Sequence, residues 1–298
     1  MSESSNKRMK FIKDLPNDLV EHITSTFLPI QTVLQNRVVS KTFKDAPIQS
    51  RDLDFSGIYS KRRTQLKVVR IIEGIFNQHK GPEIKRFVMS VNHIGLKDKI
   101  LQWVKTCLRK NIQELVLDFS KAKKVIEISV DFSAIETLTV LKLRWCKFEI
   151  PGNSPKGLRL LKTLELMRTK VTKEMIDAIF NNCIHLESLE LFNCRMYGVL
   201  NINAQHQKKF KLLVVFSMRN LLHIFVDAPT LECFKYGGYV RSVKFSKVDE
   251  LKEARLHYNR SNSWPYYNSF KRVIDNMEAY TGVHVLATTN IFLEVIFF

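Results

Sequence analysis

The chain has 298 residues, of which 45% are apolar and 10% aromatic, a composition typical of folded domains rather than of disordered chains. No run approaches the roughly 18 uninterrupted apolar residues that a membrane span needs. The polar residues 1–10 lack the apolar core of a signal peptide, and we expect them to be disordered. With five cysteines, an odd number, and no export signal, we expect reduced thiols and a cytoplasmic or nuclear protein.

The charge is strongly positive, because 47 lysines and arginines outnumber 29 aspartates and glutamates and give a net charge of +18. Such an excess attracts nucleic acids and acidic proteins over about one Debye length. The basic residues are scattered, however, and no aromatic-plus-arginine signature accompanies them. We therefore interpret them mainly as a solvated face, and nucleic-acid binding is a less favoured alternative.

Residues 11–47 have a pattern that predicts three short helices. Pro16 suits the first position of a helix, where its missing N–H costs nothing. Apolar residues lie four apart on one helical face at Leu15, Leu19, Ile23 and Phe27. Pro29 ends this helix, a second one carries Val33 and Val38, and Ser40 can cap a short third turn. Three short helices bury too little surface to be stable alone, so we expect a partner to cover the apolar face.

This segment resembles the plant-type F-box, whose spacing it keeps without an insertion from Leu28 to Lys44. In that family the motif binds a Skp-type adaptor, which links to a cullin. The resemblance implies that the adaptor surface is formed or supported by Leu15, Pro16, Leu19, Ile23, Leu28, Val38, Ser40 and Lys41. The family usually has Lys-Arg-Trp where this chain has Lys41-Thr42-Phe43. Phe43 would anchor the third helix less well than tryptophan, so the docked module would be weaker.

A second pattern, Leu-x-x-Leu-x-Leu-x-x-(Asn, Cys or a small residue), begins at Ile84. Its units start at Ile84, Ile112, Leu138, Leu161 and Leu186. Their second apolar positions lie 28, 26, 23 and 25 residues apart. This period predicts leucine-rich repeats, in which each unit supplies one strand that cannot cover its own apolar face, so that neighbours stack and share a core. Outward residues such as Lys142 and Glu165 would then lie on the concave side.

The segments between these strands favour helices behind the repeats. One apolar stripe runs from Leu96 to Leu108, and another from Met175 to Phe180 follows Thr172, a possible N-cap. Less regular units begin near Leu231 and Leu251, where the amino-acid sequence resembles the repeats of plant F-box proteins. The apolar run 291–298 is unlike the polar cap of a repeat array, so we expect a shortened member of the family.

No motif points to catalysis or to a cofactor. The sequence contains no glycine-rich phosphate loop, nucleophile elbow or zinc-protease helix, and its eight histidines are scattered. Cys183, His185 and Cys194 fit no common zinc pattern. Cys146 and Cys194 instead occupy the small-residue position of the repeat. We therefore predict a protein that is not an enzyme and holds no metal.

Together these features predict an α/β leucine-rich-repeat solenoid preceded by a three-helix F-box module. The boundaries are residues 1–10 for a disordered N-terminus, 11–47 for the F-box, 48–83 for a linker and first helical unit, and 84–298 for the repeats. The F-box/leucine-rich-repeat resemblance implies a substrate receptor of an SCF-type ubiquitin ligase, with the target protein on the repeats. A repeat scaffold without a ubiquitin role is the alternative. The identity of the target, and whether a small molecule is bound, cannot be predicted from the sequence.

Overall fold

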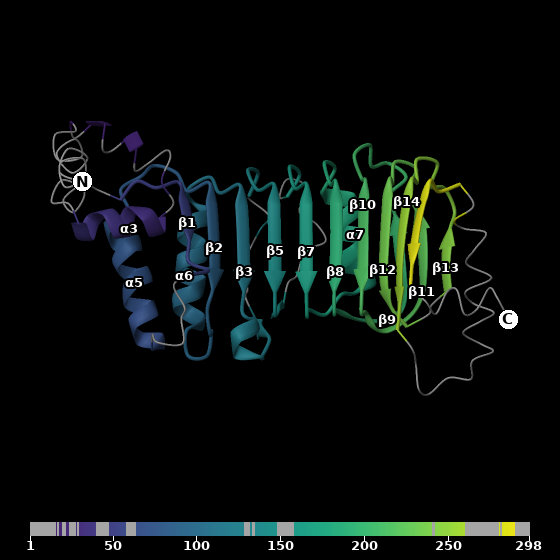
Figure 1. Cartoon of the computed structure of the whole chain (residues 1–298), viewed down its shortest axis with the longest axis horizontal. Helices are drawn as coiled ribbons and strands as arrows, with labels where there is room; N and C mark the ends of the chain where they lie inside the picture. Colours follow the sequence, from purple (N-terminus) through teal and green to yellow (C-terminus); the bar gives the residue numbers. More distant parts are fainter. Residues whose placement is uncertain are drawn as a thin grey trace, which may run out of the picture. The chain divides into compact units, whose positions relative to one another are not determined.

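The computed structural model describes residues 16, 18–19, 22–23, 28, 30–39, 48–57, 64–127, 132, 135–147, 158–239, 242–259, 280 and 282–289; side chains 36–39 are excluded (Figure 1). The chain divides into an N-terminal unit, residues 1–117, and a C-terminal unit, residues 118–298. Each unit is described by itself. Among the helices of the described residues, none is long and apolar enough to traverse a membrane.

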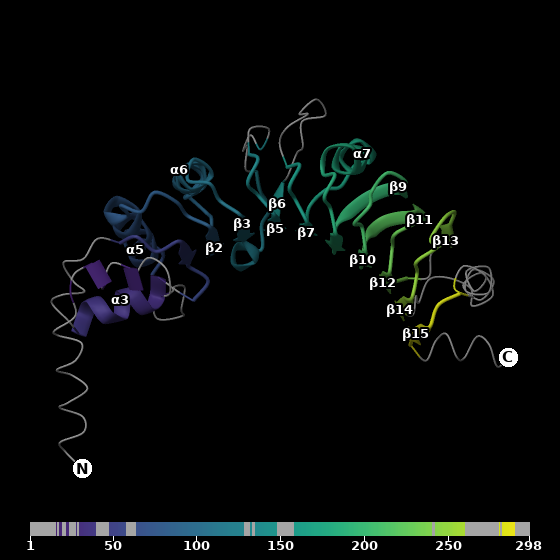
Figure 2. The same cartoon turned by 90° about the horizontal axis from the view of Figure 1, so that it is seen from above.

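The N-terminal unit contains short strands with its two longer helices packed on one side (Figure 2). Its strands are β1 (Asp52–Asp54), β2 (Arg86–Ser90) and β3 (Glu114–Asp118), which reaches the boundary between the units. β1 and β2 are parallel, with Leu53 opposite Phe87, and β3 lies beside β2. The sheet therefore begins within residues 48–83, the segment that we assigned to a linker and a helical unit.

Two amphipathic helices cover this sheet: α5 (Gln65–Gln78) and α6 (Lys97–Leu108). Their buried side chains recur every three to four residues, as expected for one face of a helix. These residues are Val68, Val69, Ile72 and Ile75 in α5, and Ile100, Trp103, Val104 and Cys107 in α6. The apolar stripe predicted between Leu96 and Leu108 is thus confirmed. Phe76 joins the helices to the sheet, with its ring centroid 6.3 Å from Trp103 and 5.8 Å from Phe87.

The main sheet of the C-terminal unit consists of parallel strands that all share one register. In spatial order they are β5 (Val140–Arg144), β7 (Thr163–Met167), β8 (Ser188–Phe192), β10 (Leu212–Phe216), β12 (Cys233–Gly238), β14 (Glu253–Tyr258) and β15 (Val285–Thr288). Leu141, Leu164 and Leu189 lie opposite one another, and each is fully buried. The repeat strands predicted after Leu138, Leu161, Leu186, Leu231 and Leu251 are all present.

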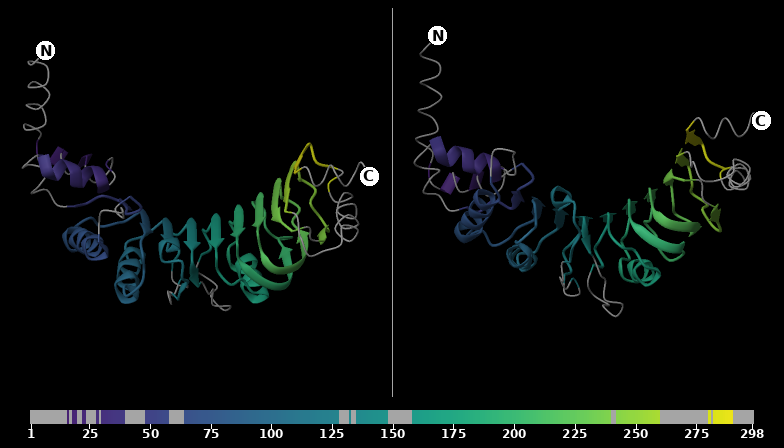
Figure 3. Two further views of the ribbon diagram at one scale, coloured as in Figure 1. Left: turned by 60° about the horizontal axis from the view of Figure 1, so that its bottom comes forward. Right: turned by 90° about the horizontal axis from the view of Figure 1, so that it is seen from below.

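The layer behind this sheet changes along the chain (Figures 2 and 3). It begins with a two-stranded pair, β4 (Ile126–Glu127) and β6 (Cys146–Lys147), and continues with helix α7 (Lys173–Asn182), whereas a 3-10 turn, η1 (Ser120–Ala122), directly follows β3. Thr172 caps α7 as predicted, since its hydroxyl accepts a hydrogen bond from the backbone N–H of Met175 at 3.2 Å.

Beyond α7, the expected helices are replaced by a second parallel sheet. It contains β9 (Arg195–Asn203), β11 (Arg219–Asp227) and β13 (Ser242–Phe245), with β11 in the middle. The physical reason is the spacing of the apolar residues. In β9, Met196, Leu200 and Ile202 are buried, and their separation by even numbers of residues places them on one side of a strand.

Four successive repeat strands, β5, β7, β8 and β10, lead into the same turn. The residue that follows the strand has a left-handed backbone, with φ of 61° at Trp145, 58° at Arg168, 51° at Asn193 and 53° at Ser217. After the first three of these residues, the next position is the small-residue position of the repeat, occupied by Cys146, Thr169 and Cys194. At Cys194 the buried thiol lies 3.2 Å from the carbonyl oxygen of Leu166 and 3.5 Å from that of Phe192, to which it can donate. The small-residue position at Cys194 thus contacts the backbone of the turn.

At the amino ends of the repeat strands, equivalent positions carry alternating charges: Lys162, Glu187, Lys211, Glu232 and Lys252. The distance between ammonium nitrogen and carboxylate oxygen is 3.3 Å for Lys162–Glu187, 2.7 Å for Lys211–Glu232 and 3.6 Å for Lys252–Glu232. Exposed pairs contribute little individually. Their alternation nevertheless avoids the like-charge repulsion that the shared register would impose on identical residues.

A buried histidine joins three segments of the N-terminal unit. The ring nitrogen Nε2 of His79 lies 3.0 Å from the carbonyl oxygen of Ser50, which can only accept, so Nε2 carries the hydrogen. Nδ1 then accepts from the Lys110 ammonium group at 3.0 Å, and that ammonium also donates to the Gly81 carbonyl oxygen at 2.7 Å. This arrangement requires a neutral ring, and burial, followed by the positive charge of Lys110, lowers the pKa of His79.

We predict that protonation of His79 makes the protein less stable in mild acid. Because the folded pKa lies below the ordinary value of 6.5, the unfolded chain binds the proton first as the pH falls. The stabilisation is complete above about pH 6.5 and decreases between that pH and the lowered folded value. Thermal unfolding midpoints of the parent and His79→Gln between pH 8 and pH 5 measure this effect. The variant should show a smaller pH dependence, whereas His206→Gln, at an exposed loop position, should behave like the parent.

Candidate functional site

The residues predicted to bind an adaptor are only partly within the described structure. Pro16 and Leu19 are exposed, Leu19 by 43%, and Ile23 and Leu28 are half-buried. Val38 lies in helix α3 (Ile30–Val39), which corresponds to the second predicted helix, but its side chain is outside the described set. Leu15, Ser40 and Lys41, together with Thr42 and Phe43, are outside it altogether. The three-helix module therefore stays a prediction.

One side of α3 is already covered within the N-terminal unit. Ile30 is fully buried and Val33 is 3% exposed, while α3 contacts strand β1. The side-chain amide nitrogen of Gln31 lies 3.4 Å from the carbonyl oxygen of Asp54 in β1, and the Ser50 hydroxyl lies 3.1 Å from the carbonyl oxygen of Leu28. The buried side of α3 thus attaches the leading segment to the sheet. Pro16 and Leu19, by contrast, are exposed.

The second candidate surface is the open face of the main sheet in the C-terminal unit, the side opposite α7 and the second sheet (Figure 2). Since the strands share one register, the side chains on this face form rows across them. One row, here the charged row, contains Lys142, Glu165, Glu190, Val214, Lys235 and Arg255. The next, the aromatic row, contains Arg144, Met167, Phe192, Phe216, Gly237 and His257.

Glu165 anchors one end of the open face. Its side chain is 5% exposed, and one carboxylate oxygen lies 2.7 Å from both Nε and Nη2 of Arg144. The other oxygen lies 3.5 Å from the ammonium nitrogen of Lys142. A carboxylate buried to this extent requires such partners, because desolvation penalises the charged form. The three side chains therefore hold each other in place and form a rigid, charged part of the surface.

Aromatic rings occupy the middle of the open face. The centroid of the Phe216 ring lies 6.0 Å from that of Phe192 and 5.9 Å from that of His257. Gly237, on the strand beyond Phe216, leaves room for this arrangement, since a Cβ atom there would collide with the Phe216 ring. The result is a half-buried apolar strip beside charged groups, a composition suited to recognising a protein segment.

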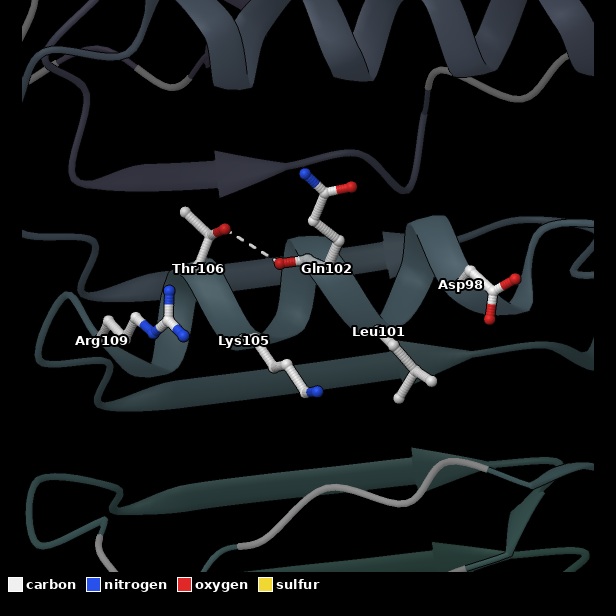
Figure 4. Close-up of a pocket in the computed structure, with 6 residues that line it drawn as sticks. All are labelled: Asp98, Leu101, Gln102, Lys105, Thr106 and Arg109. Carbon is white, nitrogen blue, oxygen red and sulfur yellow. Dashed lines mark hydrogen bonds between the residues drawn. The ribbon is translucent and has the colours of Figure 1, made fainter.

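Neither the cysteines nor a surface depression offers a reactive centre within the described residues. Burial raises the pKa of the Cys183 thiol to about 12 and that of Cys194 to about 11, so both are protonated and poor nucleophiles at neutral pH. Figure 4 shows a depression of about 420 Å³ on α6. All six residues that line it belong to α6 or to the position directly after it, so no second element encloses a ligand there. They are Asp98, Leu101, Gln102, Lys105, Thr106 and Arg109.

Comparison with known sequences identifies the family. The sequence model described as "At1g61320/AtMIF1, LRR domain" matches residues 75–283, more than half of the chain. The chain belongs to this family. It is 59% identical over 296 residues to the "FBD-associated F-box protein At1g61320" of Arabidopsis thaliana, covering 99% of this chain and 64% of that protein. It is 62% identical over 298 residues to the "Putative FBD-associated F-box protein At1g61330" of the same plant, covering 99% and 66%.

A more distant relative is the "F-box/FBD/LRR-repeat protein At1g13570" of Arabidopsis thaliana, 31% identical over 186 residues, covering 61% of this chain and 44% of that protein. No solved structure matches the chain significantly. The chain spans slightly less than two thirds of the length of its two most similar relatives named here. The resemblance to plant F-box/leucine-rich-repeat proteins is confirmed by these names and by the repeat domain.

The sequence analysis did not predict two strands of the main sheet, β10 and β15. Strand β10 supplies Val214 and Phe216 to the open face, yet its all-apolar run Leu212–Phe216 lacks the leucine spacing of the other units. The signal was a short, β-branched apolar run between polar residues, which is typical of a buried strand. Strand β15, Val285–Thr288, was likewise missed. The apolar run 291–298 lies outside the described residues.

We predict that Glu165 makes Arg144 important for stability. Arg144→Leu leaves the buried carboxylate with Lys142 as its remaining ion-pair partner among the described residues, and we expect the free energy of unfolding to fall by about 2 kcal/mol. The double variant Arg144→Leu/Glu165→Leu removes the buried charge as well and should be more stable than Arg144→Leu. Chemical denaturation of both single variants and the double variant measures the coupling. Additive effects of the two single changes would contradict this account.

Proposed function

We propose that this chain is the substrate-recognition subunit of an SCF-type ubiquitin ligase. The leading segment binds a Skp-type adaptor, and through it a cullin, while the open face binds the target protein. The observation that carries the proposal is membership of a family whose relatives are named F-box proteins. The exposure of Pro16 and Leu19 in the leading segment supports it.

In this proposal the chain contributes positioning rather than bond chemistry. Binding of a target on the open face and of the adaptor at the leading segment raises the local concentration of a target lysine near the ubiquitin carrier. Other subunits then perform the transfer. The solenoid arrangement expected for leucine-rich repeats suits this role, since it presents an extended surface to a partner. Such a complex would work in the cytoplasm or the nucleus.

The open face has a defined chemical preference as a target surface. Lys235 and Arg255 supply positive charge at one end of the charged row, and Glu190 supplies negative charge nearer the middle. The rings of Phe192 and Phe216 lie beside them. A target segment with an apolar anchor, flanked by charges of complementary sign, would match these groups.

Two other functions use the same features differently. A repeat scaffold without a ubiquitin role would bind target proteins but no adaptor, as expected if the changes at Thr42 and Phe43 abolish docking. A nucleic-acid binder would rely on the net charge of +18, and its affinity would fall steeply with salt. Absence of association with DNA and RNA at low salt would eliminate that function.

We expect the Leu15→Ala/Pro16→Ala variant to lose binding to a plant Skp-type adaptor, because the change removes apolar contact from the leading segment. A pull-down with purified adaptor measures this loss. The matched control is Leu66→Ala, which truncates a leucine that is 70% exposed on α5 and should retain binding. If the unmodified chain itself fails to bind the adaptor, the scaffold function replaces the receptor function.

A second experiment tests the target surface. Affinity capture from plant cells with the proteasome blocked should recover adaptor and target together with the unmodified chain. The Phe192→Ala/Phe216→Ala variant should retain the adaptor and lose the target, because each truncation removes an aromatic contact from the centre of the open face. Ile184→Ala, at an exposed apolar position in the turn after α7, is the control. Equal target recovery by all three proteins would place the target elsewhere.

A further inference from the structure

The second sheet of the C-terminal unit has an unusual outer face, the side directed away from the main sheet (Figure 3). The side chains that define it are Arg195, Tyr197 and Val199 from β9 and Arg219, Leu222 and Phe225 from β11. The remaining repeats of this unit carry a helix or short strands in the same layer. A solvent-facing sheet surface normally carries polar side chains, so the combination of arginines and large apolar groups requires another explanation.

The arginines face each other at an unfavourable position. Arg195 and Arg219 are direct register partners in parallel strands, and Lys170 is the register partner of Arg195 on its other side. Neighbouring strands lie about 4.8 Å apart, so three exposed cations stand in a row. Within the part of the chain that the structure describes, no carboxylate forms an ion pair with either arginine. Like charges directly opposite each other destabilise a sheet, and an anionic partner would remove that repulsion.

The apolar side chains of the outer face are strongly exposed, although folding of the sheet does not require them there. Tyr197 is 68% exposed, Leu222 54%, Val199 39% and Phe225 37%. The described residues contain thirteen exposed large hydrophobic side chains, and four of these share this one face. Isolated exposed apolar residues are ordinary, but several gathered on one surface typically mark an interaction site. The core of the sheet does not need them, because Leu200, Ile202 and Ile224 already fill its inner side.

We propose that the outer face of β9, β11 and β13 is a docking surface for an acidic protein segment that also carries apolar side chains. Carboxylates of the partner would lie against Arg195, Arg219 and Lys170, and its apolar side chains would cover Tyr197, Leu222 and Phe225. Arginine and aromatic residues together are enriched in protein interfaces. This surface is separate from the open face, and the proposal is independent of the ubiquitin-ligase function.

The charges and shapes argue against other occupants. A second copy of this chain would place the same arginines against each other, and the net charge of +18 opposes self-association. A nucleic acid would satisfy the cations and could stack on Tyr197, but it has no counterpart for the aliphatic side chains of Val199 and Leu222. Asp227, at the far end of β11, would moreover repel a long polyanion.

The test begins with a random peptide library displayed on phage and selected on the full-length chain. The most enriched peptide is then labelled, and its dissociation constant is measured by fluorescence anisotropy. We expect enriched peptides to contain Asp or Glu together with Leu, Ile or Phe. Arg195→Glu/Arg219→Glu and Tyr197→Ser/Leu222→Ser should each weaken binding by about tenfold or more. The matched control, Lys208→Glu/Lys209→Glu, changes the net charge equally at exposed loop positions and should bind normally.

Each other outcome overturns the proposal. These are the absence of an enriched peptide, enriched peptides without acidic residues, and equal weakening by the control, which would indicate non-specific attraction. A short polyuridine RNA that binds more tightly than the peptide, and loses binding in Arg195→Glu/Arg219→Glu, would assign the face to nucleic acid instead. A stability measurement gives an independent readout. Arg219→Glu alone places opposite charges across the strands, so it should raise the thermal unfolding midpoint while it weakens peptide binding.

Discussion

The structure depends on one constraint: a single repeat cannot cover its own apolar side chains. Each strand of the C-terminal unit presents its inward residues to a core that the strands on either side must complete. Leu164, Leu189 and Leu213 lie in register, and all are fully buried. A shift of one residue in any strand would send these leucines to the open face. The shared register therefore follows from burial, and it imposes the same left-handed turn after successive strands.

The same register decides the chemistry of the surfaces. Equivalent positions of consecutive repeats become neighbours in space, so a charge is favourable or unfavourable according to the residue one repeat away. Along the amino ends of the strands, lysine alternates with glutamate, and the neighbours attract. On the second sheet, Arg195 lies beside Arg219, and the neighbours repel. A row of like charges does not stabilise the fold, and we therefore propose a binding partner for it.

The apolar residues of the leading segment differ in burial. A short helix with apolar residues requires something to cover them, but its periodicity does not say what. In α3 the residues Ile30 and Val33 are buried within the N-terminal unit, and Ser50 lies within hydrogen-bonding distance of Leu28 next to this helix. Leu19, only eleven residues before Ile30, is exposed. The segment is thus held by its own sheet on one side, while Leu19 stays exposed.

The sequence by itself determined the parallel repeat strands, the two helical stripes and the cap at Thr172, because these depend on local spacing and on burial that recurs with the period. It also determined the family resemblance. Only the tertiary structure decided that strands replace the expected helices behind the later repeats. There β9, β11 and β13 form a second sheet that covers the main sheet. The tertiary structure also decided that Glu165 is buried between Arg144 and Lys142, and that Arg195 lies beside Arg219. The residues in these pairs lie 21 to 24 positions apart in the sequence. Which side chains meet depends on the exact length of each repeat, and the sequence pattern leaves that length variable.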